Sequence, residues 1–363
     1  MKNVFSGISS KLRKNEVLRS KTIIFTFVTV AYIVMQLCAD FKIIGSAMKG
    51  QLIPICVYIV LAVSLNLVVG ISGELSLGHA GFMGVGTFTG IVISAVLKDS
   101  VTNDILRLVI SMFGGGIMAG IFGVLIGIPV LRLRGDYLAI VTLAFGEILK
   151  NIIGNLYVGL DAAGLRFGLK EESIGLAEGG KMIISGPLGA TGISRISTFY
   201  MGFLLILFTL FIVLNLIHSK EGRAIKAIRD NRIAAESVGI NVMAFKMKAF
   251  VVSAMLAGMA GALYGQNYSS IMASKFNFNT SINILVFVVL GGMGNILGSV
   301  ISATVLYILP EAMRELQDYR MLLYAVVLIV VMLCTWSPKV KDFIASMAYR
   351  ITAKFKKKEA GTK

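Results

Sequence analysis

The residues of this sequence best suited to chemistry are polar side chains set inside long apolar stretches. Asn66, Glu74 and His79 fall in one such segment, LAVSLNLVVGISGELSLGHAGFMGVGTFTG, where a turn through Gly70 and Gly73 separates two apolar runs. Ionisable groups at membrane depth are costly and usually functional, and irregular backbone is tolerated there only beside protein or water. The segment therefore predicts part of a solute pathway, with helix capping at a membrane interface as the alternative.

Three further polar residues complete the set of candidate pathway residues. Glu147 and Asn151 are four residues apart in a later apolar run, so they share one helix face. Because a buried carboxylate is unfavourable unless it is paired, Glu147 either faces a polar interior or pairs with Lys150. Asn295 follows the sequence GGMG, which is dense enough in glycine to interrupt a helix.

Patterns for covalent or metal chemistry are absent or incomplete. The segment GLAEGGKM, residues 175–182, fits a phosphate-binding loop except at its last position, where Met182 cannot hold magnesium. The sequence has no HExxH pattern, and its three cysteines lack the spacing of a zinc site or of a disulfide framework. We expect this chain to have no enzymatic activity and to bind no metal and no cofactor.

The elements that position these residues must lie mostly in a membrane. Hydrophobic residues make up 56% of the 363, and with glycine the apolar content exceeds that of soluble domains. Because one spanning helix needs about 20 apolar residues, this content suffices for on the order of ten spans. The net charge of +16 is then better explained by membrane orientation than by nucleic-acid binding.

Nine apolar runs can be identified along the chain. The leader, residues 1–21, and the tail, residues 337–363, are both rich in lysine and arginine, which favours a cytoplasmic position for both. Nine crossings would put the two ends on opposite sides of the membrane. The runs are 22–39, 52–70, 78–97, 106–131, 137–154, 199–217, 249–268, 283–309 and 321–336.

A further crossing is provided by the glycine-rich break, Gly291 to Asn295, inside the run 283–309. Its halves, 284–290 and 296–309, are each too short for a full straight crossing, so we interpret them as two short, broken passages. The sequence thus predicts an all-α integral membrane protein with about ten passages and both termini cytoplasmic, in which residues 22–336 form one membrane domain. Glycines spaced four apart within the runs predict either close helix packing or a mobile gate.

The segment 218–248, between the sixth and seventh runs, is the strongest functional signal. Ser219 can cap a short helix, Asn231 can separate it from a second one, and Gly239 can end the second. Two amphipathic helices at the cytoplasmic face predict a docking surface for a cytoplasmic partner, and a solvated loop is the alternative. The apolar stripes are Ala224, Ile225 and Ile228, then Ile233, Ala234 and Val238.

At this loop the sequence resembles the coupling motif of ATP-driven importer permeases, Glu-Ala-Ala, three residues and then Gly. The sequence Ile233-Ala234-Ala235, three residues and Gly239 matches that motif with Ile in place of Glu. Four blocks are similar to the LivM-type permease family of high-affinity branched-chain amino-acid transport, and in order they span most of the chain. They are GELSLGHAGFMGVG, RLRGDYLAIVTLAFGEI, EGRAIKAIRDNRIAAESVGI and VLGGMGNILGSVISA.

The resemblance implies a multi-pass subunit of a prokaryotic plasma membrane that imports leucine, isoleucine or valine. Its partners would be a second homologous permease, two cytoplasmic ATP-binding subunits that hydrolyse ATP, and an extracytoplasmic substrate-binding protein. The implied coupling residues are Glu221, Gly222, Arg223, Ala234, Ala235 and Gly239.

Two alternatives remain open at this stage. Residues 159–165 read GLDAAGL, where many members of the family carry Gly-Gly-Ser/Thr-Asp/Asn-Gly, and urea or other small-solute permeases share the same framework. An ion-coupled secondary transporter is the alternative of another class, with Glu147 as its ion-coupling residue.

Overall fold

The computed structural model describes residues 2–41, 45–133, 135–161, 164–170, 174–175, 180–312, 325–326 and 329. The side chains of residues 2–20 lie outside this description, as do most of the predicted ninth run, 321–336, and all of the basic tail, 337–363. The chain divides into Met1–Thr304 and Val305–Lys363, and the arrangement given below is that of the first unit.

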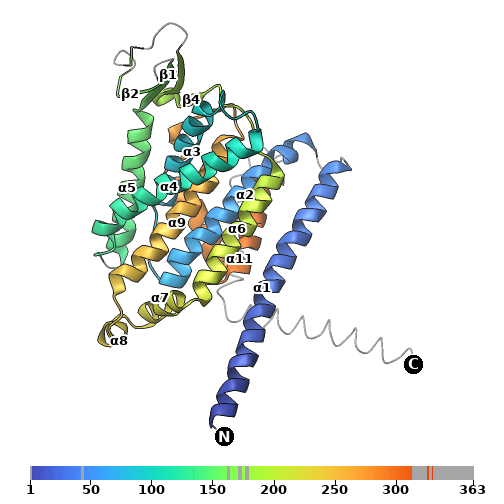
Figure 1. The fold of residues 1–363 in the computed structure, drawn as a ribbon, viewed down its shortest axis with the longest axis vertical. Coiled ribbons are helices and arrows are strands. Elements are labelled where there is room, and N and C mark those ends of the chain that lie inside the picture. Colours follow the sequence, from blue (N-terminus) through green and yellow to red (C-terminus); the bar gives the residue numbers. More distant parts are fainter. Residues whose placement is uncertain are drawn as a thin grey trace, which may run out of the picture. The chain divides into compact units, whose positions relative to one another are not determined.

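Helices make up most of the described chain (Figure 1). The α-helices are α1 Lys2–Asp40, α2 Ser46–Asn66, α3 His79–Val96, α4 Asp104–Val130, α5 Asp136–Gly154, α6 Phe199–His218, α7 Lys220–Asp230, α8 Arg232–Ser237, α9 Val242–Gly265, α10 Phe278–Gly291 and α11 Ile296–Ala312. A π-helix, η1 Leu67–Ser72, continues α2, and the short 3-10 helices are η3 Gly186–Leu188 and η4 Ala273–Lys275.

Eight helical segments of the described chain are long and apolar enough to cross a membrane. They correspond to the first eight of the nine predicted runs, which confirms a multi-pass helical membrane protein. They are Lys21–Asp40, Met48–Ser72, His79–Val96, Asp104–Val130, Asp136–Gly154, Phe199–His218, Val242–Gly265 and Ala273–Gly291.

The glycine-rich break lies where the sequence predicts it, between α10 and α11. Gly292 and Gly294 adopt φ angles of 89° and 83°, which side-chain-bearing residues rarely adopt. The prediction that both halves are too short is wrong for the first half, since the segment from η4 to the end of the 14-residue α10, Ala273–Gly291, has 19 residues and is long enough to cross. The helix begins earlier because the side chain of Asn277 caps it by accepting a hydrogen bond from Thr280 N at 3.1 Å.

A small sheet departs from the all-α prediction. Its strands are β1 Tyr157–Asp161, β2 Gly164–Gly168, β3 Lys181–Ser185, β4 Ala190–Thr191 and β5 Ser270–Ile271, all antiparallel in the order β2-β1-β3-β4-β5. The first four strands lie within one loop, whereas the fifth comes from far along the sequence, so no local pattern indicates its pairing. The sheet lies at the opposite end of the helices from α7 and α8 (Figure 1), and we call these two ends the sheet end and the loop end.

Glycines bring α3, α4 and α9 into direct backbone contact. A Cβ atom at Gly86 of α3 would lie 2.1 Å from the carbonyl oxygen of Gly258 in α9, and one at Gly258 would lie 2.6 Å from the carbonyl oxygen of Gly115 in α4. Close approach of this kind is the usual source of helix association where apolar burial gains little. The three helices thus form the core against which α2, α5 and α10 pack.

Candidate functional site

The loop between α6 and α9 forms the two short helices that the sequence predicts. Ser219 Oγ accepts a hydrogen bond from Gly222 N at 3.1 Å and so caps α7. Asn231 Oδ1 accepts one from Ala234 N at 3.0 Å and caps α8. Gly239, with a φ of 83°, ends the pair, and Ile240 N reaches back to Ala235 O at 3.1 Å. Each cap is therefore specified locally.

The two helices use their apolar residues in different ways. On α7, Ile225 and Ile228 of the predicted apolar stripe are buried, and Ile228 packs in a cluster with Ala235 and Val242. On α8, the predicted apolar stripe points outward, because Ala235 takes the inward position and leaves Ile233 80% exposed. The helix has six residues, so only one side chain per turn reaches the cluster. Val238, 75% exposed, extends this apolar surface at the loop end.

The six predicted coupling residues lie together but differ in exposure. Gly222 allows the tight α6–α7 turn, because a Cβ atom there would lie 2.2 Å from Leu216 O. Glu221 forms an ion pair with Lys248 of α9, and Arg223 donates to His218 O at 3.4 Å. The remaining three are Ala234 and Gly239, which are exposed, and Ala235, which is buried.

A partly buried lysine lies on the same helix pair. Burial lowers the pKa of Lys226 below its usual value, and the neighbouring Arg229 charge lowers it further, whereas Asp230 opposes the shift. The ammonium of Lys226 is therefore held in its charged form less firmly than that of a fully solvated lysine.

Glu74 and Arg229 fasten the loop end to the end of α2. Glu74, which follows η1, forms an ion pair with Lys246 of α9, and both side chains are largely buried. Arg229 of α7 donates from Nη1 to Gly70 O in η1 at 3.0 Å. Glu74 is a candidate from the sequence but Lys246 and Arg229 are not, since contacts between residues 172 and 159 positions apart leave no signal in a single sequence.

Asn66 and Asn295 are brought together by the break between α10 and α11. The buried amide of Asn66 donates to Asn295 O at 3.1 Å and to Ser299 Oγ at 2.7 Å, and it accepts from Gly294 N at 2.8 Å. Asn295 Oδ1 in turn accepts from Gly298 N at 3.1 Å. Asn66 therefore holds the break in place, while the Asn295 side chain is exposed.

His79 lies in the interior of the helices. Its Nε2 is 2.9 Å from Ser64 Oγ, and Ser253 Oγ donates to Ser64 O at 2.6 Å. These contacts join α2, α3 and α9 through a buried polar network. The side chain is 3% exposed, so it opens onto no surface of this chain.

Glu147 and Asn151 lie on an outward face of α5. Glu147 pairs with Lys150, which resolves the alternative left open by the sequence, and its Oε1 also accepts from Phe278 N at 3.1 Å at the start of α10. Asn151 is exposed one turn further along, and Asn283 is exposed on α10. The outward face of α5 and α10, called here the polar face, thus carries these polar side chains beside exposed apolar ones such as Ile140 and Ile148.

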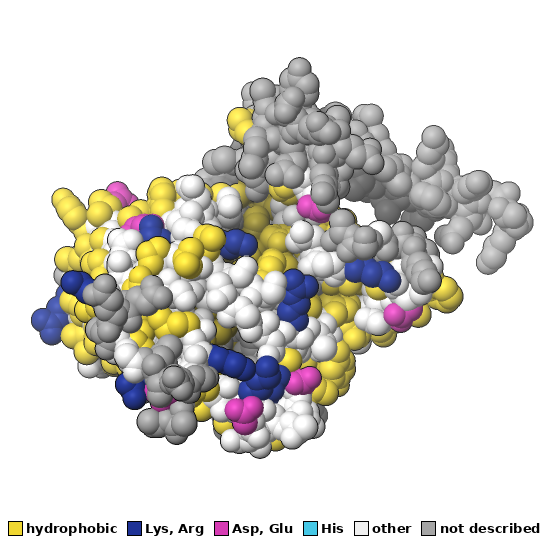
Figure 2. Space-filling model, turned by 90° about the horizontal axis from the view of Figure 1, so that it is seen from above, with side chains coloured by type: hydrophobic (Ala, Val, Ile, Leu, Met, Phe, Trp, Pro, Cys, Tyr) yellow, Lys and Arg dark blue, Asp and Glu magenta, His cyan; other side chains and the backbone are white. Residues whose placement is uncertain are grey.

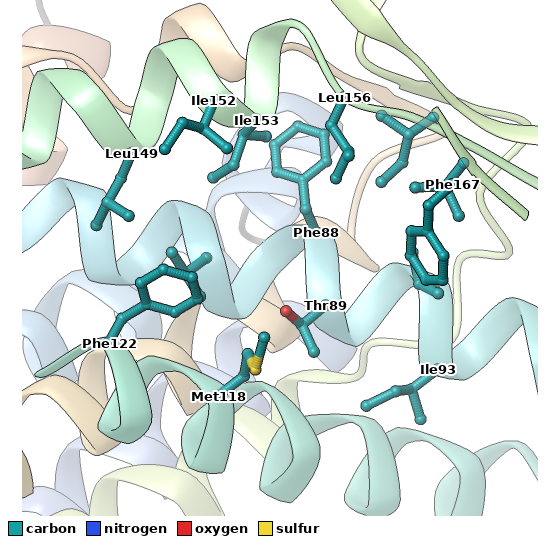
Figure 3. Close-up of a pocket in the computed structure, with 14 residues that line it drawn as sticks. Phe88, Thr89, Ile93, Met118, Phe122, Leu149, Ile152, Ile153, Leu156 and Phe167 are labelled. Atoms are coloured by element: carbon teal, nitrogen blue, oxygen red, sulfur yellow. The ribbon is translucent and has the colours of Figure 1, made fainter. Parts of the chain in front are cut away.

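Two cavities lie near the sheet end. One, of about 260 Å³, is enclosed by α3, α4, α5 and strands β1, β2 and β3, and Figure 3 shows Phe88, Met118, Ile153 and Phe167 around it. The other, of about 200 Å³, is lined by apolar groups together with Lys98, Asp99 and Lys181. Figure 2, which views this end, shows cationic and acidic side chains intermixed. In the described residues, no group of three His, Cys, Asp or Glu is placed to bind a metal.

Residues 48–333 match the family described as the permease component of branched-chain amino acid transport systems. The chain belongs to this family. It is 35% identical to the high-affinity branched-chain amino acid transport system permease protein LivM of Escherichia coli (strain K12) over 294 residues, which are 78% of this chain and 67% of that protein.

More distant relatives carry the same description. The probable LivM permease of Methanocaldococcus jannaschii is 23% identical over 72% of this chain and 82% of its own length. The LivH permease of Salmonella typhimurium is 23% identical over 69% of this chain and 79% of its own length. No solved structure matches the chain significantly. Membership of the family confirms a membrane transport permease.

Proposed function

We propose that the chain is a permease subunit of an ATP-driven importer that carries leucine, isoleucine or valine across a prokaryotic plasma membrane. The observation that supports this most directly is the α7–α8 pair, whose capped helices present Ile233 and Val238 to solvent. An exposed apolar surface next to cationic groups is typical of an interaction site. Two ATP-binding subunits dock there and hydrolyse ATP, while this chain does no covalent chemistry.

The proposed topology has ten passages and both termini in the cytoplasm. The loop end then faces the cytoplasm, because α7, α8 and the start of α9 carry a cluster of lysines and arginines. The sheet end faces outward and, with its mixed charges, meets the extracytoplasmic substrate-binding protein.

The second, homologous permease packs along the polar face of α5 and α10. Only 33% of the apolar stretch of α5 is buried within this chain, and the same share of the stretch Ala273–Gly291 is buried. Glu147, Asn151, Asn283 and Asn295 lie on or beside this face, and polar groups at membrane depth normally face protein or water rather than lipid. The cargo therefore passes between the two permeases, with the buried Asn66 and His79 supporting the wall.

The test is uptake by the complete transporter in proteoliposomes, with both permeases, the ATP-binding subunits and the substrate-binding protein. We expect uptake of labelled leucine that requires hydrolysable ATP and every subunit, and no uptake of urea. Uptake of urea instead of leucine would contradict the proposed substrate. Uptake by this chain alone, driven by an ion gradient, would contradict the importer and favour a secondary transporter.

A further inference from the structure

A chain of contacts joins the α7–α8 pair to the break between α10 and α11. Arg229 of α7 donates to Gly70 O in η1 at 3.0 Å. On the other side of Gly70 there is no room for a side chain, since a Cβ atom would lie 1.9 Å from Asn66 Oδ1 and 2.2 Å from Gly294 N. The contacts run from the loop end into the break without a gap.

Arg229 is held at three places, which makes it suited to transmit a displacement. The carbonyl groups at a helix end have no hydrogen-bond partner within the helix. Gly70 lies two residues before the end of η1, and its carbonyl oxygen accepts a hydrogen bond from Arg229 instead. The stem of Arg229 packs on Gly73, where a Cβ atom would lie 2.6 Å from its Cγ. Its Nε and Nη2 donate to Asp230 Oδ1 at 3.1 and 2.9 Å, so the guanidinium has a fixed orientation.

Asn66 carries the connection from Gly70 to the break. Its side chain is fully buried and bonds Gly294 N, Asn295 O and Ser299 Oγ. Breaking bonds of a buried amide is costly because no water replaces the lost partner. The end of α2 and the start of α11 therefore move as one body, and π-helical turns such as η1 often lie at functional sites.

We propose that Arg229 is the positioning residue through which movement of α7 and α8 displaces the glycine-rich break, by way of Gly70 and Asn66. This inference rests on the proposed function, because it takes the α7–α8 pair as the surface on which the ATP-binding subunits act. Arg229 touches no cargo in this mechanism.

The matched pair of variants is Arg229→Ala and Arg232→Ala in the complete reconstituted transporter. Arg232 is a suitable control because it is similarly exposed, 34% against 38% for Arg229, and pairs only with Glu236 of its own helix among the contacts described. We expect Arg229→Ala to lower leucine uptake per ATP hydrolysed by about tenfold, the scale of one lost charged hydrogen bond. Arg232 also belongs to the docking surface, but a loss of docking lowers uptake and hydrolysis together, so Arg232→Ala should leave the ratio of uptake to hydrolysis unchanged. Arg229→Lys should be intermediate, because one ammonium cannot reproduce the bonds of a guanidinium fork.

A second measurement reports the movement itself. Met293 in the break is 53% exposed, so Met293→Cys, in a background with the native cysteines replaced, can be labelled by a water-soluble thiol reagent. We expect ATP to change the labelling rate severalfold when Arg229 is present or when Arg232 is replaced. The rate should not respond to ATP in the Arg229→Ala background.

Three results would overturn the proposal. One is an Arg229→Ala transporter with an unchanged ratio of uptake to hydrolysis, and another is an equal loss in Arg232→Ala. If the Arg229→Ala chain does not assemble with its partners, Arg229→Lys is compared with Arg232→Ala instead. Equal ratios of leucine uptake to ATP hydrolysis in these two variants would then overturn the proposal. Uptake by the unsubstituted transporter that does not depend on ATP is a different outcome, and it would contradict the proposed function itself.

Discussion

Asn66 and His79 illustrate how a polar residue in an apolar run can serve structure rather than passage. Both were candidates for the pathway because a polar group at membrane depth needs a reason to be there. In the fold, Asn66 forms hydrogen bonds with the backbone of the break and His79 forms one with Ser64. Each side chain therefore has hydrogen-bond partners within the protein. Glu147, Asn151 and Asn295 instead reach a surface. Both groups consist of polar residues within or beside apolar helices. They differ in whether the side chain points into the chain or toward its surface.

The glycines of the core give a prediction at the same scale. Gly86→Ala should destabilise the protein by about 1–3 kcal/mol, because the added methyl group overlaps the Gly258 backbone and forces two packed helices apart. The measurement is thermal unfolding of the purified protein in detergent. Gly50→Ala is the control, since nothing lies within 4 Å of a Cβ atom there, and it should leave the midpoint unchanged or raise it slightly. Equal midpoints for the two variants would contradict the packing argument.

At the scale of elements, the α7–α8 pair has one face packed against the molecule and one apolar face left exposed. The buried cluster of Ile228, Ala235 and Val242 attaches it to α9, and Arg229 attaches it to η1. Ile233 and Val238 are left outside. A loop that served only as a solvated connection would not need caps at both helices and an outward apolar surface.

This arrangement predicts the effect of a charge on the outward face. Ile233→Asp should weaken association with the ATP-binding subunits by at least about tenfold while the protein itself stays folded, because the side chain makes few contacts within the chain. The association is measured by copurification of the ATP-binding subunits with this chain, and its consequence by ATP-dependent uptake. Leu188→Asp is the control, as Leu188 is 66% exposed at the sheet end. Retained association in Ile233→Asp would count against docking at this surface.

At the scale of the whole molecule, the chain has an outward side that is polar on one face and apolar on another. The polar face of α5 and α10 carries Asn151 and Asn283. On α4, by contrast, the exposed residues include Ile117 and Leu125, which are 55% and 60% exposed. Polar groups at membrane depth normally face protein or water, so the proposed function places protein or water against Asn151 and Asn283.

The contrast between the faces can be tested by cysteine labelling in the complete transporter, again with the native cysteines replaced. Asn151→Cys and Asn283→Cys should react with a water-soluble thiol reagent, because they line a hydrated path. Ile117→Cys should be protected, because thiolate chemistry needs water and this position faces lipid. Protection of both asparagine positions together with rapid labelling at Ile117→Cys would contradict the proposed pathway.

The sequence by itself determined the features that depend on local physics. Apolar runs specify membrane helices because backbone groups in lipid must be bonded within the segment, and Ser219, Asn231 and Gly239 specify the helix ends at the loop. The glycine-rich break is likewise local, since Gly292 and Gly294 adopt backbone angles that other residues rarely adopt.

Only the tertiary structure decided which polar residues meet. The partners of Glu74, Asn66 and Gly70 lie far away in the sequence, and the sheet takes its fifth strand from beyond α9. The tertiary structure also decided that the apolar stripe of α8 faces outward. A helix of six residues is oriented by the elements that it packs against and not by its own apolar pattern. Contacts of this kind arise when helices pack, and packing depends on many residues at once.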